Sequence, residues 1–112
     1  MAVLSVEILF DAAIRIQLAE GSITLTFFED TIRIKFPTTR RLAEFLEVPH
    51  YYVLPYFAMM EQEELVTRAE RVGILTTAKG SRKMIAMMKE KYLQETEDIL
   101  GASVFQEIIN KI

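Results

Sequence analysis

The sequence lacks several residue types on which common chemistries depend. It has no cysteine, which excludes disulfide bonds and thiol catalysis. Its single histidine, His50, excludes a metal site built from several histidines. No apolar run approaches the roughly 18 residues that a membrane-spanning helix needs, and the first residues do not form a basic stretch followed by a cleavable apolar one. We therefore expect a cytoplasmic protein with no metal, no cofactor and no membrane partner.

The chain is also short of positive charge. Its 112 residues include 13 basic and 16 acidic side chains, for a net charge of −3. Binding to nucleic acid requires lysine and arginine to neutralise phosphate, so this balance argues against a strongly basic surface overall. The basic residues are concentrated between positions 68 and 91, where seven of them stand against two glutamates and give a local net charge of +5. A local positive region of this kind can steer DNA to one face of an acidic molecule.

Apolar residues, in contrast, are abundant enough for a compact core. They make up 51% of the sequence, which suits one domain stabilised without metal or disulfide. No repeat, low-complexity tract or linker divides the chain. We expect a single α+β domain over 1–112 with three parts, at 1–37, 38–77 and 78–112.

Residues 5–19 fit two structures. A helix would place Glu7, Asp11 and Arg15 on one polar face with apolar residues opposite, and Ser5 and Gly21 stand where it would begin and end. Two strands are the alternative, because VEILF and IRIQL alternate well enough to form a hairpin. We favour the helix, since the motif described below needs a first helix to pack against.

The next segments predict a β-hairpin. ITLTFF and TIRIKF alternate cleanly on either side of Glu29-Asp30. Pro37 ends the second strand because it has no N–H to continue the ladder. A threonine, Thr38 or Thr39, then caps a short helix.

Residues 42–66 predict a short helix, a tight turn and a longer helix that leads directly into a strand. Ala43 provides the small side chain that close packing of the short helix needs, and Val48 provides the apolar plug of the turn. Apolar residues at four- and three-residue spacing form a buried stripe on the longer helix: Val53, Phe57 and Met60. The strand continues to position 69, and a turn at 70–73 returns the chain as a second strand.

The remaining residues predict helices. With Thr77 as N-cap, a long helix is expected from Ala78 to Leu100, ended by Gly101, and a short one follows at 103–111. Apolar residues form a seam along the long helix: Ile85, Met88, Tyr92 and Ile99. We expect the C-terminal helices to pair with those of a second copy in a homodimer. The alternative is that the same stripe folds onto the chain's own core.

This order of elements resembles the winged helix-turn-helix family of transcription regulators, which is common in archaea and bacteria. The resemblance covers 45 residues, from Thr39 to Lys83. It rests on core positions that align without a gap: Leu42, Ala43, Leu46, Val48, Val53, Phe57, Met60, Glu61, Leu65 and Val66. The segment TTAKGSRK looks like the end of the family's wing and the start of its next helix. Residues 22–36 are longer than the short strand that the family usually has there.

The resemblance implies a winged helix-turn-helix fold with an additional N-terminal β-hairpin and C-terminal helices. It also implies a DNA-binding protein, a transcription regulator like the members of the family, whose second motif helix enters the major groove by its N-terminal end. The positions that would then face the groove are His50, Tyr51, Leu54, Pro55 and Ala58, with Tyr52 beside them. No arginine or asparagine stands among them to read guanine or adenine. Pro55 fits this helix only if the helix begins near Tyr51 or Tyr52, so that the proline falls in the first turn.

Basic residues on both sides of that helix are the expected phosphate contacts. They are Arg40 and Arg41 at the first motif helix, Arg68 and Arg71 on the wing, and Lys79, Arg82 and Lys83 beyond it. Contacts of this sort set affinity and register and do not select a sequence. The alternative is an ordinary solvated charged surface. With His50, Tyr51 and Tyr52, these residues make up the candidate DNA-binding set.

The tyrosine-rich helix has a second interpretation as a protein-binding surface, because tyrosine offers a large rigid contact area. A third is simple packing under the N-terminal hairpin. The competing functions are therefore a winged-helix protein-interaction module and an accessory subunit of a DNA-processing assembly without sequence readout. Catalysis is not expected, since the sequence has no nucleophile with a nearby base, no glycine-rich phosphate loop and no paired-carboxylate motif.

Overall fold

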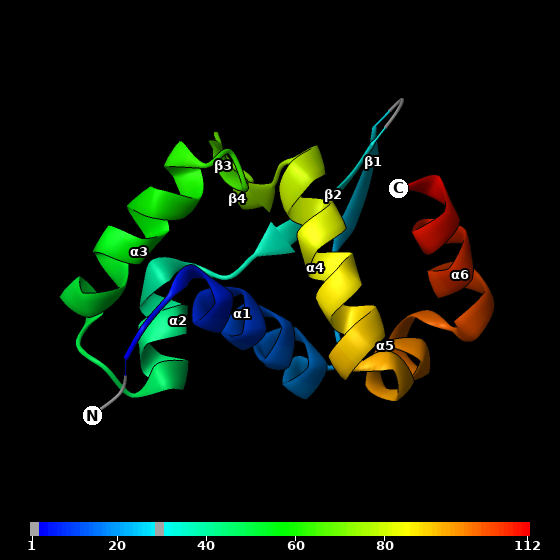
Figure 1. The fold of residues 1–112 in the computed structure, drawn as a ribbon, viewed down its shortest axis with the longest axis horizontal. Coiled ribbons are helices and arrows are strands. Elements are labelled where there is room, and N and C mark those ends of the chain that lie inside the picture. Colours follow the sequence, from blue (N-terminus) through cyan, green and yellow to red (C-terminus); the bar gives the residue numbers. More distant parts are fainter. Residues whose placement is uncertain (1–2, 29–30) are drawn as a thin grey trace.

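The computed structural model describes residues 3–28 and 31–112, and these ranges contain six helices and four strands (Figure 1). In chain order they are α1 (Val6–Glu20), β1 (Leu25–Phe28), β2 (Thr31–Phe36), α2 (Thr39–Leu46), α3 (His50–Gln62), β3 (Val66–Ala69), β4 (Gly73–Thr76), α4 (Ala78–Lys91), α5 (Leu93–Leu100) and α6 (Ala102–Lys111). The α+β class expected from the sequence is confirmed. No helix in the two described ranges is long and apolar enough to cross a membrane.

The strands form one antiparallel sheet in the order β1-β2-β4-β3. Its two hairpins come from separate parts of the chain and meet through two residue pairs, Lys35 with Leu75 and Phe36 with Ile74. The N-terminal hairpin is therefore continuous with the β3–β4 hairpin, and α3 lies between them in the sequence.

Buried hydroxyl groups extend the short contact between β2 and β4. The N–H of Ile34 donates to the hydroxyl of Thr76 at 2.8 Å, and that oxygen lies 2.7 Å from Ser81 Oγ at the start of α4. Ser81 in turn donates to the carbonyl of Ile32. Thr76 and Ser81 are fully buried, so this chain of hydrogen bonds joins β2, β4 and α4 without competition from water.

The predicted N-terminal hairpin is confirmed in β1 and β2, whereas the turn expected at Glu29-Asp30 lies outside the described residues. The second strand alternates as expected, with Ile32, Ile34 and Phe36 buried. The first strand is only partly covered, and Phe27 remains 58% exposed. The hairpin thus contributes mainly β2 to the core.

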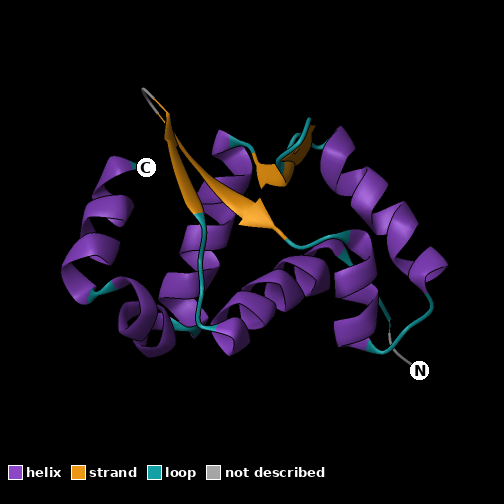
Figure 2. Cartoon of the chain, turned by 180° about the vertical axis from the view of Figure 1, so that it is seen from behind, coloured by secondary structure: helices purple, strands orange, loops and turns teal. Residues whose placement is uncertain are grey.

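Residues 6–20 form one helix, so the helical prediction for this segment is confirmed and the hairpin alternative is wrong. Ser5 accepts a hydrogen bond from the N–H of Ile8 at 3.1 Å, which caps the helix. Gly21 ends it in the left-handed conformation, with φ of 68°. The helix α1 runs beneath the sheet between α2 and α4 (Figure 2).

The predicted pair α2 and α3 is also present. Thr38 caps α2 by accepting from the N–H of Arg41, and Ala43 is buried where the helices pack. The three residues of the expected stripe on α3, Val53, Phe57 and Met60, are all buried.

The helix α3 begins at His50, one residue before Tyr51, with Pro49 as its N-cap. Pro55 is then the sixth residue of the helix and lies just beyond the first turn, where a proline is expected to be costly. There it removes the amide that would bond to the carbonyl of Tyr51. Pro55 is exposed, and water can satisfy that carbonyl on the outer side of the helix.

The single long helix expected at 78–100 is wrong as well. It divides into α4 and α5 at Tyr92, whose φ of −134° is not helical. The phenol of Tyr92 donates to Asp11 Oδ1 of α1 at 2.6 Å. This contact with a distant helix explains a break that no proline or glycine marks in the sequence.

The apolar stripe of the C-terminal helices is buried within the chain itself. Phe105 and Ile108 of α6 are 1% and 2% exposed, and α6 lies beside the N-terminal hairpin, with Lys111 Nζ 5.6 Å from the ring centre of Phe27. The homodimer expected through this stripe therefore loses its structural basis and remains an untested prediction. The alternative, packing onto the chain's own core, describes the observed arrangement.

Replacing Ile108 with alanine should lower the free energy of unfolding by about 2–5 kcal/mol, because it opens a cavity in the monomer's core. Val104→Ala, at an exposed position of the same helix, is the control and should cost less than about 1 kcal/mol. Urea unfolding at two protein concentrations measures both effects. A midpoint that rises with concentration in the wild type, and no longer does so in Ile108→Ala, would instead place this stripe between two copies.

Burial and the hydrogen bond to Asp11 raise the pKa of Tyr92 to about 12. The unfolded value is about 10, so the stabilising effect is complete below pH 10 and is lost as the pH rises through 12. Wild-type protein should lose stability over this window more steeply than Tyr92→Phe, which should itself be about 1 kcal/mol less stable at pH 7. Denaturant titrations across the window measure the difference, and parallel curves for the two proteins would contradict it.

Candidate nucleic-acid interface

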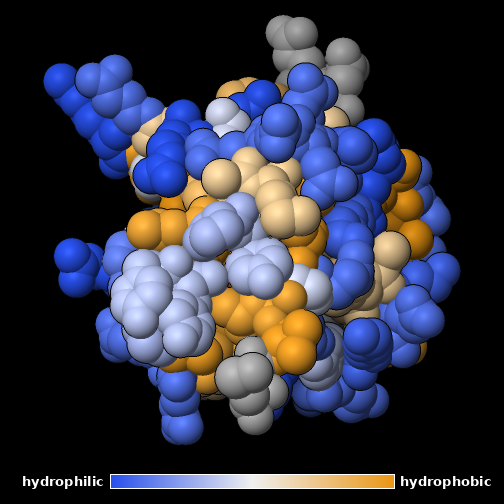
Figure 3. Space-filling model, turned by 60° about the vertical axis from the view of Figure 1, so that its left-hand side comes forward, coloured by the Kyte–Doolittle hydropathy of each residue, from blue (hydrophilic) through white to orange (hydrophobic). Residues whose placement is uncertain are grey.

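The outward face of α3 is aromatic and apolar. Tyr51 and Tyr52 are 66% and 48% exposed, and their rings meet edge to face with centroids 4.8 Å apart. Leu54 and Met59 are exposed on the same helix. Figure 3 shows this side of the molecule as pale and orange atoms within a border of blue side chains. A side-chain hydrogen bond with Tyr52 raises the pKa of Tyr51, so the phenol of Tyr51 offers an uncharged hydroxyl group.

His50 serves a structural contact at the start of this helix. Its Nε2 lies 2.7 Å from Thr39 Oγ1, which joins the first turns of α2 and α3. The ring is half-buried. Because Nε2 contacts Thr39, only Nδ1 is available to a ligand. Of the three residues expected to touch DNA from this helix, the two tyrosines are the accessible ones.

On the β3 side of the helix, two expected phosphate contacts are held by other protein groups. Arg68 Nε lies 3.3 Å from Glu61 Oε2, and its guanidinium stacks 5.0 Å from the ring centre of Phe57. Lys79 Nζ donates to the carbonyl of Glu63 at 3.0 Å, at the C-terminal end of α3. Both cations already contact groups of α3, so a phosphate would have to compete with these contacts.

Arg41 and Lys83 are turned toward α1. Arg41 lies 3.4 Å from a carboxylate oxygen of Glu20, and Lys83 forms an ion pair with Glu7 while standing 5.7 Å from the ring centre of Phe10. Two of the seven basic residues expected to contact phosphate are therefore paired with carboxylates of α1 that lie far away in the sequence. The DNA-binding role of the set stays a prediction.

Five of the seven expected cations are exposed: Arg40, Arg68, Arg71, Lys79 and Arg82. Of these, Arg40, Arg71 and Arg82 form no ion pair or side-chain hydrogen bond with another residue of the described ranges. Arg40 stands at the start of α2, and Arg71 stands in the β3–β4 turn with φ of 68°. Arg40 and Arg71 thus flank, in the chain, the segment that contains α3.

Arg82 has a different setting. It borders a groove of about 540 Å³ between the end of α3, β3 and the start of α4, together with Glu61, Glu64 and Lys79. Acidic and basic groups alternate there, so the groove attracts phosphate less than an all-cationic one would. Arg82 is therefore a weaker candidate than Arg40 and Arg71.

No group of three or more histidine, cysteine, aspartate or glutamate side chains within the described ranges could hold a metal ion. A cavity of about 380 Å³ does occur between the end of α1, the base of the N-terminal hairpin and the start of α2. Sequence reasoning missed it because its walls come from three separate segments. The one sequence signal was Gln17, a polar residue on the otherwise apolar side of α1.

No family model matches the chain, and no curated protein matches its sequence. Function is therefore inferred from the residues and geometry described above.

The two arginines of the β3–β4 hairpin should behave differently on replacement. Arg68→Ala should lower the free energy of unfolding by about 0.5–1.5 kcal/mol, because it removes an ion pair and a cation–π contact. Arg71→Ala should change it by less than about 0.5 kcal/mol, as expected at a solvated position. Urea unfolding of both variants tests this assignment. Equal losses of stability would show that Arg71 is also a structural residue.

Proposed function

We propose that the chain is a winged helix-turn-helix protein that binds duplex DNA. One observation supports this most: α3 presents an exposed face, and the β3–β4 hairpin that follows it carries an exposed arginine in its turn. Three helices, α1, α2 and α3, pack together, and β3–β4 joins β2 in the sheet. This is the arrangement that a reading helix and a wing require. The N-terminal hairpin and the helices α4 to α6 are additions around that unit.

In this proposal the N-terminal end of α3 approaches the major groove. Thr38 caps α2 through its side chain, whereas Pro49 makes no side-chain bond to the first amides of α3. Those amides and the helix dipole favour a phosphate oxygen at this end. Arg40 and Arg71 add phosphate contacts on the two sides, and Tyr51 and Tyr52 lie against the groove.

The proposed mode has little capacity for direct readout. Bidentate recognition of guanine or adenine needs arginine, lysine, asparagine or glutamine on the reading helix, and none stands on the exposed N-terminal half of α3. Affinity should come mainly from phosphates and from the shape of the groove. Binding should therefore depend strongly on salt and weakly on sequence.

Fluorescence anisotropy with duplexes of about 20 base pairs tests the proposal. Affinity should fall steeply between about 50 mM and 200 mM salt, and Arg40→Ala or Arg71→Ala should each reduce the salt slope by about 0.9. The loss should be similar for duplexes of unrelated sequence. Lys83→Ala is the matched control, because it removes one positive charge that is paired with Glu7.

Absence of binding to any duplex at about 50 mM salt would contradict the DNA proposal. An equal effect of Lys83→Ala and Arg71→Ala would contradict the proposed surface, since the loss would then reflect net charge alone.

The second candidate is a protein-interaction module, and the exposed tyrosine pair with Leu54 and Met59 favours it. Aromatic residues and methionine are enriched at protein interfaces, and an exposed apolar patch is costly without a partner. An accessory subunit of a DNA-processing assembly would use the same face. A transcription regulator would need two copies to read two half-sites, and the buried C-terminal stripe does not supply that interface.

A further inference from the structure

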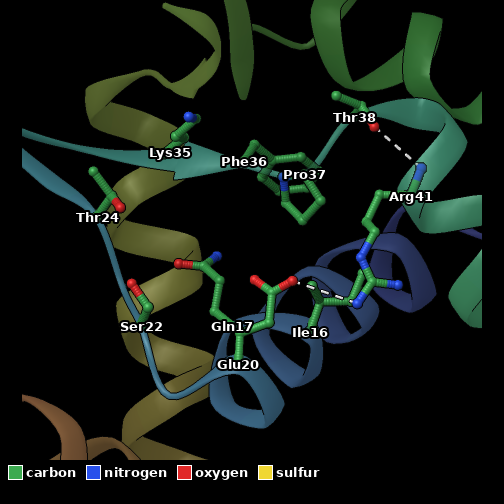
Figure 4. Close-up of a pocket in the computed structure, with 10 residues that line it drawn as sticks. All are labelled: Ile16, Gln17, Glu20, Ser22, Thr24, Lys35, Phe36, Pro37, Thr38 and Arg41. Atoms are coloured by element: carbon green, nitrogen blue, oxygen red, sulfur yellow. Dashed lines mark hydrogen bonds and ion pairs between the residues drawn. The ribbon is translucent and has the colours of Figure 1, made fainter.

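The cavity between α1, the N-terminal hairpin and α2 is lined by three kinds of group. Its volume of about 380 Å³ lies within the range of small-molecule sites. Ile16, Phe36 and Pro37 make its apolar wall, and Ser22, Thr24 and Thr38 contribute hydroxyl groups. The remaining side chains are Gln17, Glu20, Lys35 and Arg41, so both signs of charge are present beside an apolar surface. Figure 4 shows these residues arranged around the space between helix and strand.

Two charged side chains at the edge of the cavity, Arg41 and Glu20, form only a weak ion pair with each other. Arg41 Nη2 and Glu20 Oε2 are 3.4 Å apart, and their side chains are 41% and 53% exposed. An ion pair with this exposure contributes little to stability, because water and salt screen it. A ligand with both a negative and a positive group can therefore replace the contact between Arg41 and Glu20 with one contact to each of them, at a small cost in stability.

Gln17 provides the second observation. It is only 6% exposed, and Figure 4 shows its carboxamide pointing from α1 toward the strands, with Ser22 on one side and Glu20 on the other. Its Nε2 donates to the carbonyl of Ala13 at 3.3 Å, and Oε1 has no hydrogen-bond partner among the described residues. A buried acceptor without a donor is unfavourable. The terminal torsion of glutamine is broad, so a donor placed in the cavity can meet this oxygen after a small turn of the carboxamide.

We propose that this cavity binds a small zwitterion with an apolar side chain, of the class of free aliphatic or aromatic amino acids. The carboxylate pairs with the guanidinium of Arg41, which can bind it in two parallel hydrogen bonds, and Lys35 adds a second positive charge. The ammonium group donates to Glu20 and to Gln17 Oε1. The side chain packs on the apolar wall. The site shares no residue with the proposed DNA contacts, although Arg41 follows Arg40 in the first turn of α2.

Titration of ¹⁵N-labelled protein with L-leucine, followed by two-dimensional NMR, tests the proposal. Amide signals of Gln17, Thr24, Thr38 and Arg41 should move and saturate below about 10 mM leucine, while those of α6 stay in place. Two half-ligands separate the charges: 4-methylpentanoate lacks the ammonium group, and 3-methylbutylamine lacks the carboxylate. Each should bind at least about tenfold more weakly than leucine, because it leaves one charged partner unmatched.

Variants test which groups are responsible. Arg41→Gln and Glu20→Gln should each weaken leucine binding about tenfold or more. The matched controls are Lys89→Gln and Glu44→Gln, exposed charges outside the cavity, and they should leave it unchanged. Equal affinity for leucine and 4-methylpentanoate, or no movement of the cavity amides with any of the three probes, would overturn the proposal. If a variant fails to fold, the three probes on the wild-type protein still decide the question.

Discussion

The architecture depends on a narrow contact between β2 and β4. Only two residue pairs join these strands, and the buried hydroxyls of Thr76 and Ser81 continue the connection to α4. Removal of the Thr76 hydroxyl would leave the amide of Ile34 unpaired in the core, and removal of the Ser81 hydroxyl would do the same to the carbonyl of Ile32. A buried polar group without a partner lowers stability more than the loss of both partners would. Next to this contact Gly80 lets α4 approach the segment after α3, where a Cβ would lie 1.8 Å from the carbonyl oxygen of Leu65. The sheet contact and this close approach together fix the β3–β4 hairpin and the end of α3 relative to the core.

That constraint decides which side of α3 is available. Its inner stripe packs on α1 and α2, and its outer side is left with two tyrosines, a leucine, a proline and a methionine. The basic residues nearby are divided by their partners, since Arg68 and Lys79 bind the acidic end of α3 and Arg41 and Lys83 bind α1. The expected cations that keep no such partner within the described residues are Arg40, Arg71 and Arg82, and Arg82 borders the groove of mixed charge. This pattern suits loose, salt-dependent contact with a duplex better than precise base recognition.

Much of the fold could be predicted because its signals are local. Ser5 and Gly21 mark the ends of α1, alternation marks the hairpin, and spacing marks the buried stripe of α3. The features that the sequence did not predict depend on contacts between residues far apart in the chain. The break at Tyr92 is accompanied by a bond to Asp11, 81 residues earlier, and Lys83 finds Glu7 across 76 residues. The spacing of apolar residues does not reveal such long-range partners. The same is true of the cavity, because its walls come from separate segments that meet only in the folded chain.

The central claim is that the face of α3, together with Arg40 and Arg71, forms a DNA-binding surface. Locating the residues that a bound duplex contacts tests this claim directly. In a ¹⁵N NMR titration with a short duplex at low salt, the signals that move should belong to the first turns of α2 and α3 and to the β3–β4 turn around Arg71. The signals of α5, α6 and β1 should remain in place. Movement centred on α6 or the N-terminal hairpin, with α3 unaffected, would contradict the account.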